Sequence, residues 1–301
     1  MGNFQRRCLK LAALGAAPIL FVVGADAGVA GAASTVTIPT VAKSASLAGA
    51  VPAGIKAKGT LLVAADATYA PDEFVASDGS TIIGMDADLA QSIGQVLGLK
   101  VTLVNATFDT IIPALESGKY DLGMSSFTDT KARQKTVNFV DYFLAGEGYY
   151  VSARSKYHPN GLTALCGHSV AVESGTTEQS DAQAEAKTCA KHKAAAVKVL
   201  SFSTQNEANL AVSSGRASVG FADSQVAQYI VAQSNGQFVS AGTAFETAPY
   251  GIAIPKGTTM DKSVQGAVKA LIANGTYLKI LKKWGIQAGA VNTANVNGAT
   301  S

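Results

Sequence analysis

The sequence is poor in the residues that most often carry catalysis or metal binding. It contains three cysteines, three histidines and one tryptophan in 301 residues, and only 15% of its side chains are charged. We find no Ser/His/Asp, Cys/His or phosphate-cradling pattern, and the three histidines lie apart from the polar clusters that follow the expected strands. The sequence therefore predicts no catalytic residues, no metal and no cofactor.

The chain also lacks a strong excess of charge of either sign. The net charge is +3, and residues 1–33 contribute +2 of it through Arg6, Arg7 and Lys10 against Asp26. Removing that segment leaves a chain of about +1, which argues against nucleic acid or an anionic membrane as the main partner. Apolar residues make up 48% of the chain, and its length suits one large or two modest α/β domains.

The N-terminus reads as an export signal over residues 1–33. Basic residues at 6–10 precede an apolar run at 11–23, and Ala30-Gly31-Ala32 is a small-residue cleavage site. The alternative is a membrane anchor, but the run is short and rich in alanine. The pair Arg6-Arg7 leaves export by the twin-arginine route open beside export by the general Sec route. Cys8 lies before the apolar run and not at the cleavage point, so it cannot be a lipoprotein anchor. We expect an exported, periplasmic or otherwise extracytoplasmic protein.

Only two cysteines, Cys166 and Cys189, follow the export signal. An oxidising compartment favours a disulfide between them, worth about 3 kcal/mol for a loop of that length in the chain-entropy model. The alternative is zinc, because His168 and His192 stand near the two cysteines, although this spacing matches no common zinc module.

From Gly59 onward the pattern alternates short apolar strands with amphipathic helices, after a flexible lead-in at 34–54. Repeated β-α-β units predict mainly parallel sheets with right-handed crossovers, and the restart after an extended crossing near 145–153 predicts two lobes. Strands are expected at 61–65, 101–104, 120–124, 169–173, 197–200, 217–222 and 250–254, and helices at 108–117, 176–191, 204–214 and 224–232.

The segment SSFTDTKAR, residues 125–133, follows the expected strand at 120–124. In open α/β sheets, ligands bind beyond the carboxyl ends of strands. Ser126 and Thr128 offer short hydrogen-bonding groups, and Arg133 offers a planar fork that matches a carboxylate. The segment predicts a site for a small molecule that carries an anionic group.

Three further polar clusters also follow expected strands, at Asp66 to Tyr69, at Thr176 and Thr177, and at Asp223. Two of the four clusters lie in each half of the chain, so facing halves would bring all four to one cleft. Each residue also has a structural explanation: Arg133 as a solvated helix face, Asp223 and Thr177 as helix caps, Asp66 as a turn residue, and Tyr69 and Phe108 as core.

Seven segments together resemble a known family. They are DATYAPDEF (66–74), IIGMDADLA (82–90), FDTIIPALESGKYDLGMSSFTDTKARQK (108–135), VESGTTEQ (172–179), GFADSQVA (220–227), PYGIAIPKG (249–257) and NGTYLKILKKWG (274–285). In number, order and spacing they are similar to extracytoplasmic solute-binding proteins that feed polar amino acids to ABC importers, bacterial solute-binding protein family 3. The resemblance covers residues 59–286.

The resemblance implies a periplasmic-binding-protein fold, α/β, with two lobes and two crossover segments. The first lobe would comprise 55–147 and 249–287, the second 148–248, and a polar tail would follow at 288–301. A free amino acid would be trapped between the lobes and handed to the membrane permease of an ABC importer, and the binding protein would be a monomer without nucleic acid.

The resemblance also implies roles for individual residues. Arg133 would take the α-carboxylate, helped by Ser126, Thr128 and the amides near Thr177, and Asp223 would take the α-ammonium. Tyr69 and Phe108 would sandwich the side chain, with Asp66 near its end. The full expected ligand-binding set is Asp66, Tyr69, Glu73, Phe108, Ser125, Ser126, Phe127, Thr128, Arg133, Thr176, Thr177 and Asp223.

One position departs from the family pattern: Asp72 stands where many relatives carry an aromatic. With Asp66 and Glu73 it would place three acids near the side-chain end, which favours a cationic ligand such as arginine or lysine, although relatives with an acid at the Asp66 position also take other amino acids. The sequence does not fix the ligand.

Two other functions stay open. The same fold hosts amino-acid dehydratases, for which Glu173 or Glu178 would be the candidate acids. A ligand-sensing domain is the other, but sensors of this kind are fused to membrane spans and output domains, and this chain ends in a polar segment at 292–301.

Overall fold

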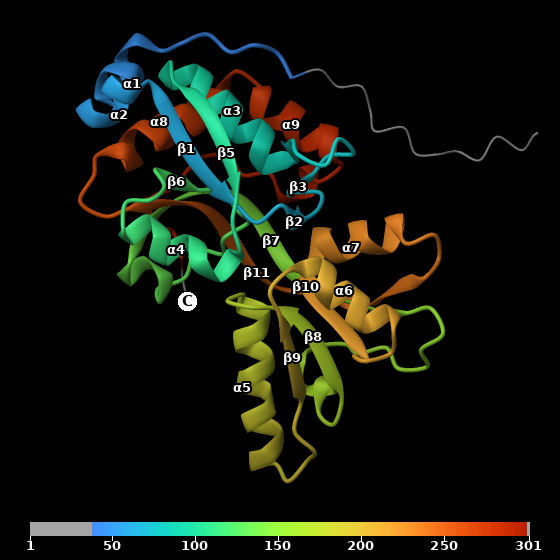
Figure 1. The fold of residues 1–301 in the computed structure, drawn as a ribbon. Coiled ribbons are helices and arrows are strands. Elements are labelled where there is room, and N and C mark those ends of the chain that lie inside the picture. Colours follow the sequence, from blue (N-terminus) through green and yellow to red (C-terminus); the bar gives the residue numbers. More distant parts are fainter. Residues whose placement is uncertain (1–37, 300–301) are drawn as a thin grey trace, which may run out of the picture. The chain divides into compact units, whose positions relative to one another are not determined.

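The computed structural model describes residues 38–299, so the expected export signal lies outside the described residues. Strands and helices alternate along the chain as the sequence predicts (Figure 1). Within 38–299, no helix is both long and apolar enough to cross a membrane. The structure is α/β, in agreement with the expected fold class.

Eight strands form one sheet in the order β5-β1-β6-β11-β7-β10-β8-β9. They are β1 (Thr60–Ala65), β5 (Lys100–Asn105), β6 (Leu122–Gly123), β7 (Val137–Ser152), β8 (Ser169–Glu173), β9 (Lys198–Phe202), β10 (Val219–Asp223) and β11 (Phe238–Pro255). The pairs at each end are parallel, whereas β7 and β11 pair antiparallel through the middle. The two expected parallel groups are thus joined into one sheet, because β7 and β11 are far longer than the short crossing the sequence predicts.

Two separate groups of buried hydrophobic side chains define two lobes. The first lobe packs α3 (Met85–Leu97), α8 (Met260–Ala273) and α9 (Thr276–Trp284) around strand β1, with α4 (Phe108–Glu116) on a second cluster of the same lobe. The second lobe packs α5 (Thr177–Lys191), α6 (Gln205–Ser213) and α7 (Ser224–Gln233) around β8 and β10. A small three-stranded sheet, β2 (Thr68–Tyr69), β3 (Glu73–Val75) and β4 (Ile82–Ile83), extends the first lobe.

Both ends of the described chain are more ordered than the sequence suggests. Part of the expected flexible lead-in forms α1 (Ala45–Ala50), and α2 (Ala53–Lys58) follows it. Val51, between the two helices, is buried in the first lobe, which supplies the apolar contact that short helices need for stability.

The polar tail packs back on the first lobe after the short turn of 3-10 helix at Gln287–Gly289. Val296 bridges Val140 in β7, and the side-chain oxygen of Asn297 accepts a hydrogen bond from the amide of Phe139 at 2.8 Å. The amide of Ala299 donates to Asp129 at 3.0 Å, which links the tail to the segment that carries Arg133.

The strands that connect the lobes are irregular where they cross. The pairing between β7 and β11 shifts register between Ala241 and Phe245 and again between Phe245 and Ala248. Gly146 lies opposite this stretch, where a Cβ atom would stand 2.9 Å from the carbonyl oxygen of Phe245. The close approach of the two backbones explains why a glycine occupies position 146.

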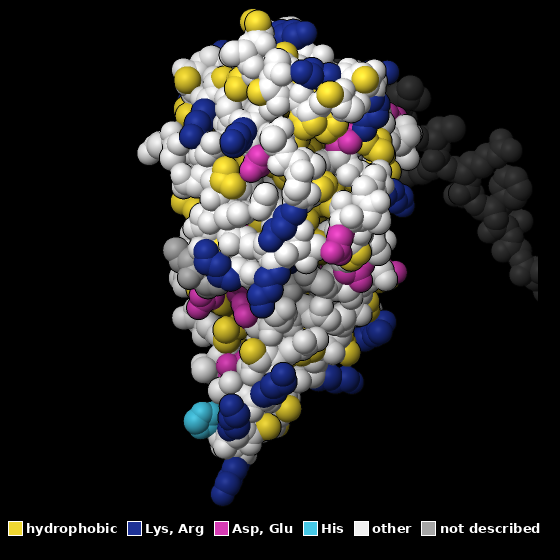
Figure 2. All heavy atoms as spheres, turned by 90° about the vertical axis from the view of Figure 1, so that its left-hand side faces the viewer, with side chains coloured by type: hydrophobic (Ala, Val, Ile, Leu, Met, Phe, Trp, Pro, Cys, Tyr) yellow, Lys and Arg dark blue, Asp and Glu magenta, His cyan; other side chains and the backbone are white. Residues whose placement is uncertain are grey.

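Charged side chains are dispersed over the face of the molecule drawn in Figure 2. Lys and Arg side chains lie scattered among uncharged surface, with Asp and Glu between them. This face presents no continuous patch of one sign.

Candidate ligand-binding site

A pocket lies between the lobes and is walled by side chains of both. Its walls are formed by Asp66, Tyr69, Phe108, Ser125, Ser126, Thr128, Arg133, Glu173, Thr176, Thr177, Glu178 and Asp223. The structure thus brings together every residue of the expected ligand-binding set except Glu73 and Phe127.

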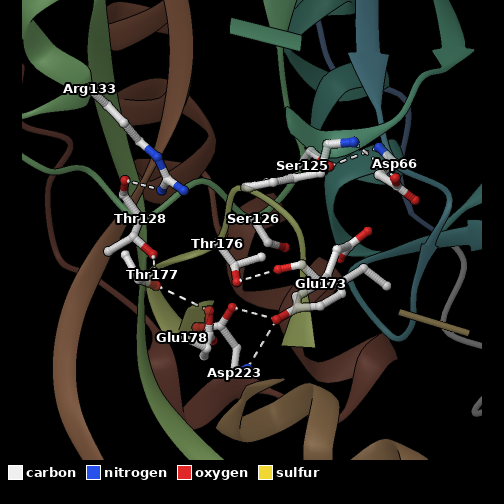
Figure 3. A pocket seen from close by; sticks show the side chains of 12 residues that line it. Asp66, Ser125, Ser126, Thr128, Arg133, Glu173, Thr176, Thr177, Glu178 and Asp223 are labelled. Carbon is white, nitrogen blue, oxygen red and sulfur yellow. Dashed lines mark hydrogen bonds between the residues drawn. The ribbon is translucent and has the colours of Figure 1, made fainter. Parts of the chain in front are cut away.

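The pocket residues meet because parallel strands end at the same edge of each lobe (Figure 3). Asp66 follows β1 and Ser125 comes shortly after β6 in the first lobe, while Glu173 ends β8 and Asp223 ends β10 in the second. The carboxyl ends of these strands carry the polar side chains into one volume, as expected for open α/β sheets.

Arg133 reaches into the pocket and joins the two lobes. Its guanidinium donates to the carbonyl oxygens of Thr128 in the first lobe and Gly175 in the second, both at 2.8 Å. It also lies 5.4 Å from the ring centre of Phe108. Burial lowers the pKa of Arg133, while Glu178 and Asp223 favour its charged form. The alternative of a solvated helix face is therefore wrong.

Asp223 stands directly before α7, yet within residues 38–299 its side chain caps no amide of that helix. Instead it accepts a hydrogen bond from the hydroxyl of Tyr69 in the other lobe at 2.8 Å, and that hydroxyl accepts one from the Asp223 amide at 3.0 Å. Burial raises the pKa of Asp223 to about 7, against hydrogen bonds from Tyr250 and Tyr69 that lower it. A capping role does not account for this carboxyl group.

The N-terminus of α5 also faces the pocket. The cap is Thr176, whose hydroxyl accepts from the amide of Gln179 at 3.1 Å, and not Thr177 as the alternative supposed. Thr177 points across the cleft instead, where its hydroxyl lies 3.3 Å from that of Thr128 and donates to the carboxyl group of Glu178 at 3.2 Å. Two hydroxyls from opposite lobes and the amides of a helix N-terminus together form a favourable environment for an anion.

Asp66 and the serines form the first-lobe wall. The carboxylate of Asp66 accepts from the amide of Phe108 at 3.0 Å and from the hydroxyl of Thr68 at 2.7 Å, while burial raises its pKa. Ser126 has a φ of 51°, in the left-handed region that non-glycine residues rarely adopt, and its amide is held by Asp86 at 3.0 Å. Such backbone strain is typical of functional sites.

The structure places Glu73 and Phe127 behind the pocket wall. The carboxyl group of Glu73 turns inward, where it accepts from the hydroxyls of Ser125 and Ser126 at 3.0 and 3.1 Å. Phe127 stacks beneath Phe108, with ring centres 4.5 Å apart. Both residues support the wall from within the first lobe, and neither lines the pocket.

Asp72 is also buried behind the wall and does not line the side-chain end. It accepts from the amide nitrogen of Gln225, a second-lobe residue, at 2.7 Å. Burial and the neighbouring Asp86 raise the pKa of Asp72 to about 8. The expectation of three acids at the side-chain end is wrong for Asp72 and Glu73, because both carboxyl groups turn inward and are buried behind the wall; Asp72 is hydrogen-bonded there through one oxygen and Glu73 through both.

Two other acids, Glu173 and Glu178, line the pocket instead. Both are almost fully buried, and within the described part of the chain one oxygen of each, Oε1, has no hydrogen-bond partner. Burial raises the pKa of both well above the ordinary value. Both glutamates flank residues 174–177, where the sequence predicts part of the site, so their position in the sequence could have indicated a place in the pocket. From the sequence they were named only as candidate acids of the dehydratase alternative.

The expected disulfide is confirmed: Cys166 and Cys189 are bonded, with Cα atoms 5.7 Å apart. It ties the C-terminal part of α5 to the loop before β8. The zinc alternative is wrong, because both cysteines are bonded to each other and supply no thiolate for a metal. His168 stacks on Tyr157 at a ring-centre distance of 3.6 Å.

Comparisons with known proteins agree with this geometry. Residues 61–287 match the family of bacterial extracellular solute-binding proteins, family 3. The chain is 31% identical over 248 residues to the arginine-binding protein ArgT of Corynebacterium glutamicum, covering 82% of this chain and 81% of the relative. A solved ancestral arginine-binding protein bound to arginine shares 35% identity with a TM-score of 0.70, covering 75% and 98% of the two chains.

A second solved structure is that of an ancestral amino acid-binding protein described as a precursor of cyclohexadienyl dehydratase. It shares 34% identity and a TM-score of 0.69, over 77% of this chain and 97% of the other. The family match spans most of the sequence and includes every residue of the pocket wall. The chain therefore belongs to the bacterial extracellular solute-binding proteins of family 3.

Proposed function

We propose that the protein binds a free amino acid with a cationic side chain, arginine in the first place, and delivers it to the permease of an ABC importer. The main support is the charge of the pocket, where Arg133 faces the carboxyl groups of Asp66, Glu173, Glu178 and Asp223. The pocket thus contains more acidic groups than basic ones. An α-ammonium would pair with only part of these acidic groups, so the remaining carboxyl groups favour a ligand with a second positive charge. The arginine-binding relatives support the same ligand.

The α-carboxylate would be held by Arg133. Its two bonds to protein carbonyls leave three of the five N–H groups of a guanidinium, enough for a bidentate contact. The hydroxyls of Thr128 and Thr177 and the N-terminus of α5 would add donors from both lobes.

The α-ammonium would be held by Asp223, whose oxygen is oriented by the Tyr69 hydroxyl. Glu178 lies on the same side of the pocket. Its charge, like the charge of Asp223, raises the pKa of Tyr69. The rings of Tyr69 and Phe108 would flank the side chain, and Asp66 would lie toward its end. This arrangement exchanges the water around each ligand charge for a paired group of opposite sign.

Ligand binding would be coupled to closure of the lobes. The described structure carries hydrogen bonds between lobes at Arg133, at Tyr69 and at Gln225, all of which need the closed arrangement. A ligand that touches groups of both lobes gains contacts only in the closed state and so shifts the equilibrium toward it. The closed form is then the form delivered to the importer.

Membership in the family also supports an extracytoplasmic location after export of the chain. We expect lobe boundaries at 55–147 with 249–287 and at 148–248. Most of each buried cluster lies within one of these parts, which supports the division, although Tyr69 packs with second-lobe residues. We expect a monomer that carries no nucleic acid.

A second candidate function is a dehydratase acting on a cyclohexadienyl amino acid. Glu178 favours it, since a buried carboxyl with a raised pKa stays protonated and could donate to a leaving hydroxyl. A relative described as a precursor of such an enzyme also supports it. Binding without turnover is still our proposal, because ArgT and the arginine-bound ancestral protein are both binding proteins. Aromatic product formed from a cyclohexadienyl substrate would overturn it.

A thermal-shift panel tests the proposed function. The protein without residues 1–33 would be unfolded, dialysed and refolded to remove bound ligand, then heated with each common amino acid, ornithine and citrulline. A ligand at 100 times its Kd stabilises the fold by about 2.7 kcal/mol, so arginine should give the largest rise in Tm. Glutamate or aspartate as the strongest ligand, or no shift with any amino acid, would contradict the proposal.

A further inference from the structure

Two carboxyl groups face each other from opposite lobes at one end of the pocket. Asp66 follows β1 in the first lobe, and Glu173 is the last residue of β8 in the second. Each residue is only 2% exposed, and both line the pocket (Figure 3). The two side chains interact: the charge of Asp66 raises the pKa of Glu173, and hydrogen bonding with Glu173 lowers that of Asp66.

The two groups differ in how their oxygens are satisfied. Asp66 accepts from donors of its own lobe on both oxygens, from Phe108 on one and from Thr68 on the other. Glu173 has an oxygen, Oε1, that meets no hydrogen-bond donor anywhere in residues 38–299. A buried carboxylate oxygen without a donor is costly, so Glu173 needs either a proton or a donor from outside the chain.

No cation of the described protein compensates Glu173. The charged groups that act on it are the carboxyls of Asp66, Glu178 and Asp109, and they all raise its pKa together with burial. The hydroxyls of Tyr69 and Tyr150 are the other titratable groups near it. Arg133 is not among the groups that shift the pKa of Glu173, and its guanidinium donates to the carbonyls of Thr128 and Gly175.

We propose that Glu173 is the specificity-determining residue for the ligand's side chain, accepting a hydrogen bond from a terminal guanidinium or ammonium group that bridges it to Asp66. This inference rests on the proposed function and deepens it, because it assigns the choice of side chain to a residue of the second lobe. The cation then links Asp66 and Glu173 as Arg133 links the carbonyls of the two lobes. When the side chain of the ligand is neutral, no cation lies between the two facing carboxyl groups, so one of them must stay protonated.

Proton release follows from this role. Without ligand, Glu173 holds a proton, which adds no charge beside Asp66. A ligand cation replaces that proton as the partner of the carboxylate, so the proton leaves to solvent while the ligand keeps its own protons. Arginine binding should therefore release protons, and citrulline, which has the same length but a neutral ureido end, should release fewer.

The test compares arginine with citrulline by calorimetry on the wild type, Glu173→Gln and Glu178→Gln. The isosteric Glu173→Gln should weaken arginine by about 30-fold or more, with citrulline changed little, so that the preference for arginine collapses. Glu178→Gln is the matched control: it lies on the α-ammonium side and should weaken both ligands by the same factor. Titrations in buffers of different ionisation enthalpy should show more proton release with arginine than with citrulline for the wild type, and no such difference between the two ligands for Glu173→Gln.

Two results would overturn the proposal: an unchanged ratio of arginine to citrulline affinity in Glu173→Gln, or equal proton release for both ligands in the wild type. The second measurement needs no variant, so it stands even if Glu173→Gln does not fold. Glu173→Asp keeps the charge and should retain the preference for arginine at reduced affinity. A wild type that binds neither ligand would instead refute the proposed function itself.

Discussion

Replacing Arg133 by alanine tests the centre of the binding proposal. The guanidinium is partly buried, lies against Phe108, and is held by carbonyls of both lobes at 2.8 Å. It lies outside the buried hydrophobic clusters that support each lobe. We therefore expect Arg133→Ala to fold, to bind amino acids far more weakly, and to close less readily.

The magnitude follows from the loss of one partner of a buried, hydrogen-bonded charge pair. Such truncations cost about 2–5 kcal/mol, which corresponds to roughly 30- to 4,000-fold in Kd. Loss of the bond to the Gly175 carbonyl adds to this by removing a contact between the lobes. Arg133→Lys keeps the charge but lacks the planar fork, so its loss of affinity should be intermediate.

Isothermal calorimetry on ligand-free protein measures these affinities, with far-ultraviolet circular dichroism as the check on folding. Arg154→Ala, at an exposed arginine, is the matched control and should bind as the wild type does. An Arg133→Ala protein that folds and keeps its affinity within about threefold, less than the smallest loss expected for a buried charge pair, would refute the assignment of Arg133 to the α-carboxylate.

Three further predictions concern charge, pH and the disulfide. Wild-type affinity should rise with pH between about 6 and 8, because Asp223, with a pKa of about 7, must ionise to pair an ammonium; Asp223→Asn should bind weakly and lose this rise in calorimetry. Asp72 has a folded pKa of about 8, above its unfolded value of 3.8, so its contribution to stability is present at low pH and lost as pH rises toward 8. In urea unfolding, the free energy of unfolding of Asp72→Asn should thus rise relative to that of the wild type between pH 5 and 9. A difference between the two proteins that does not change with pH would count against a buried acid at this position. Cys166→Ser with Cys189→Ser should lose about 3 kcal/mol in urea, and no loss would show that the bond constrains little.

The sequence predicted the pocket through strand ends but not through side-chain direction. Local periodicity places Asp66, Thr177 and Asp223 after strands, and the topology then gathers them. Whether a carboxyl turns outward or inward depends on donors distant in sequence, so the burial of Glu73 beneath Ser125 was missed. The same limit hid the pocket positions of Glu173 and Glu178, and the lengths of β7 and β11, which are set by pairing across the whole molecule.

Two register shifts and a crowded glycine mark the place where the chain crosses between lobes. Regular ladders on either side resist bending, whereas shifts at 241–248 leave the backbone opposite Gly146 without continuous pairing. Any motion that opens the cleft would therefore concentrate its dihedral changes in this short stretch, and the two lobes would swing as rigid bodies about it. A side chain at position 146 would wedge the crossing apart and alter the resting angle of the molecule without touching the pocket.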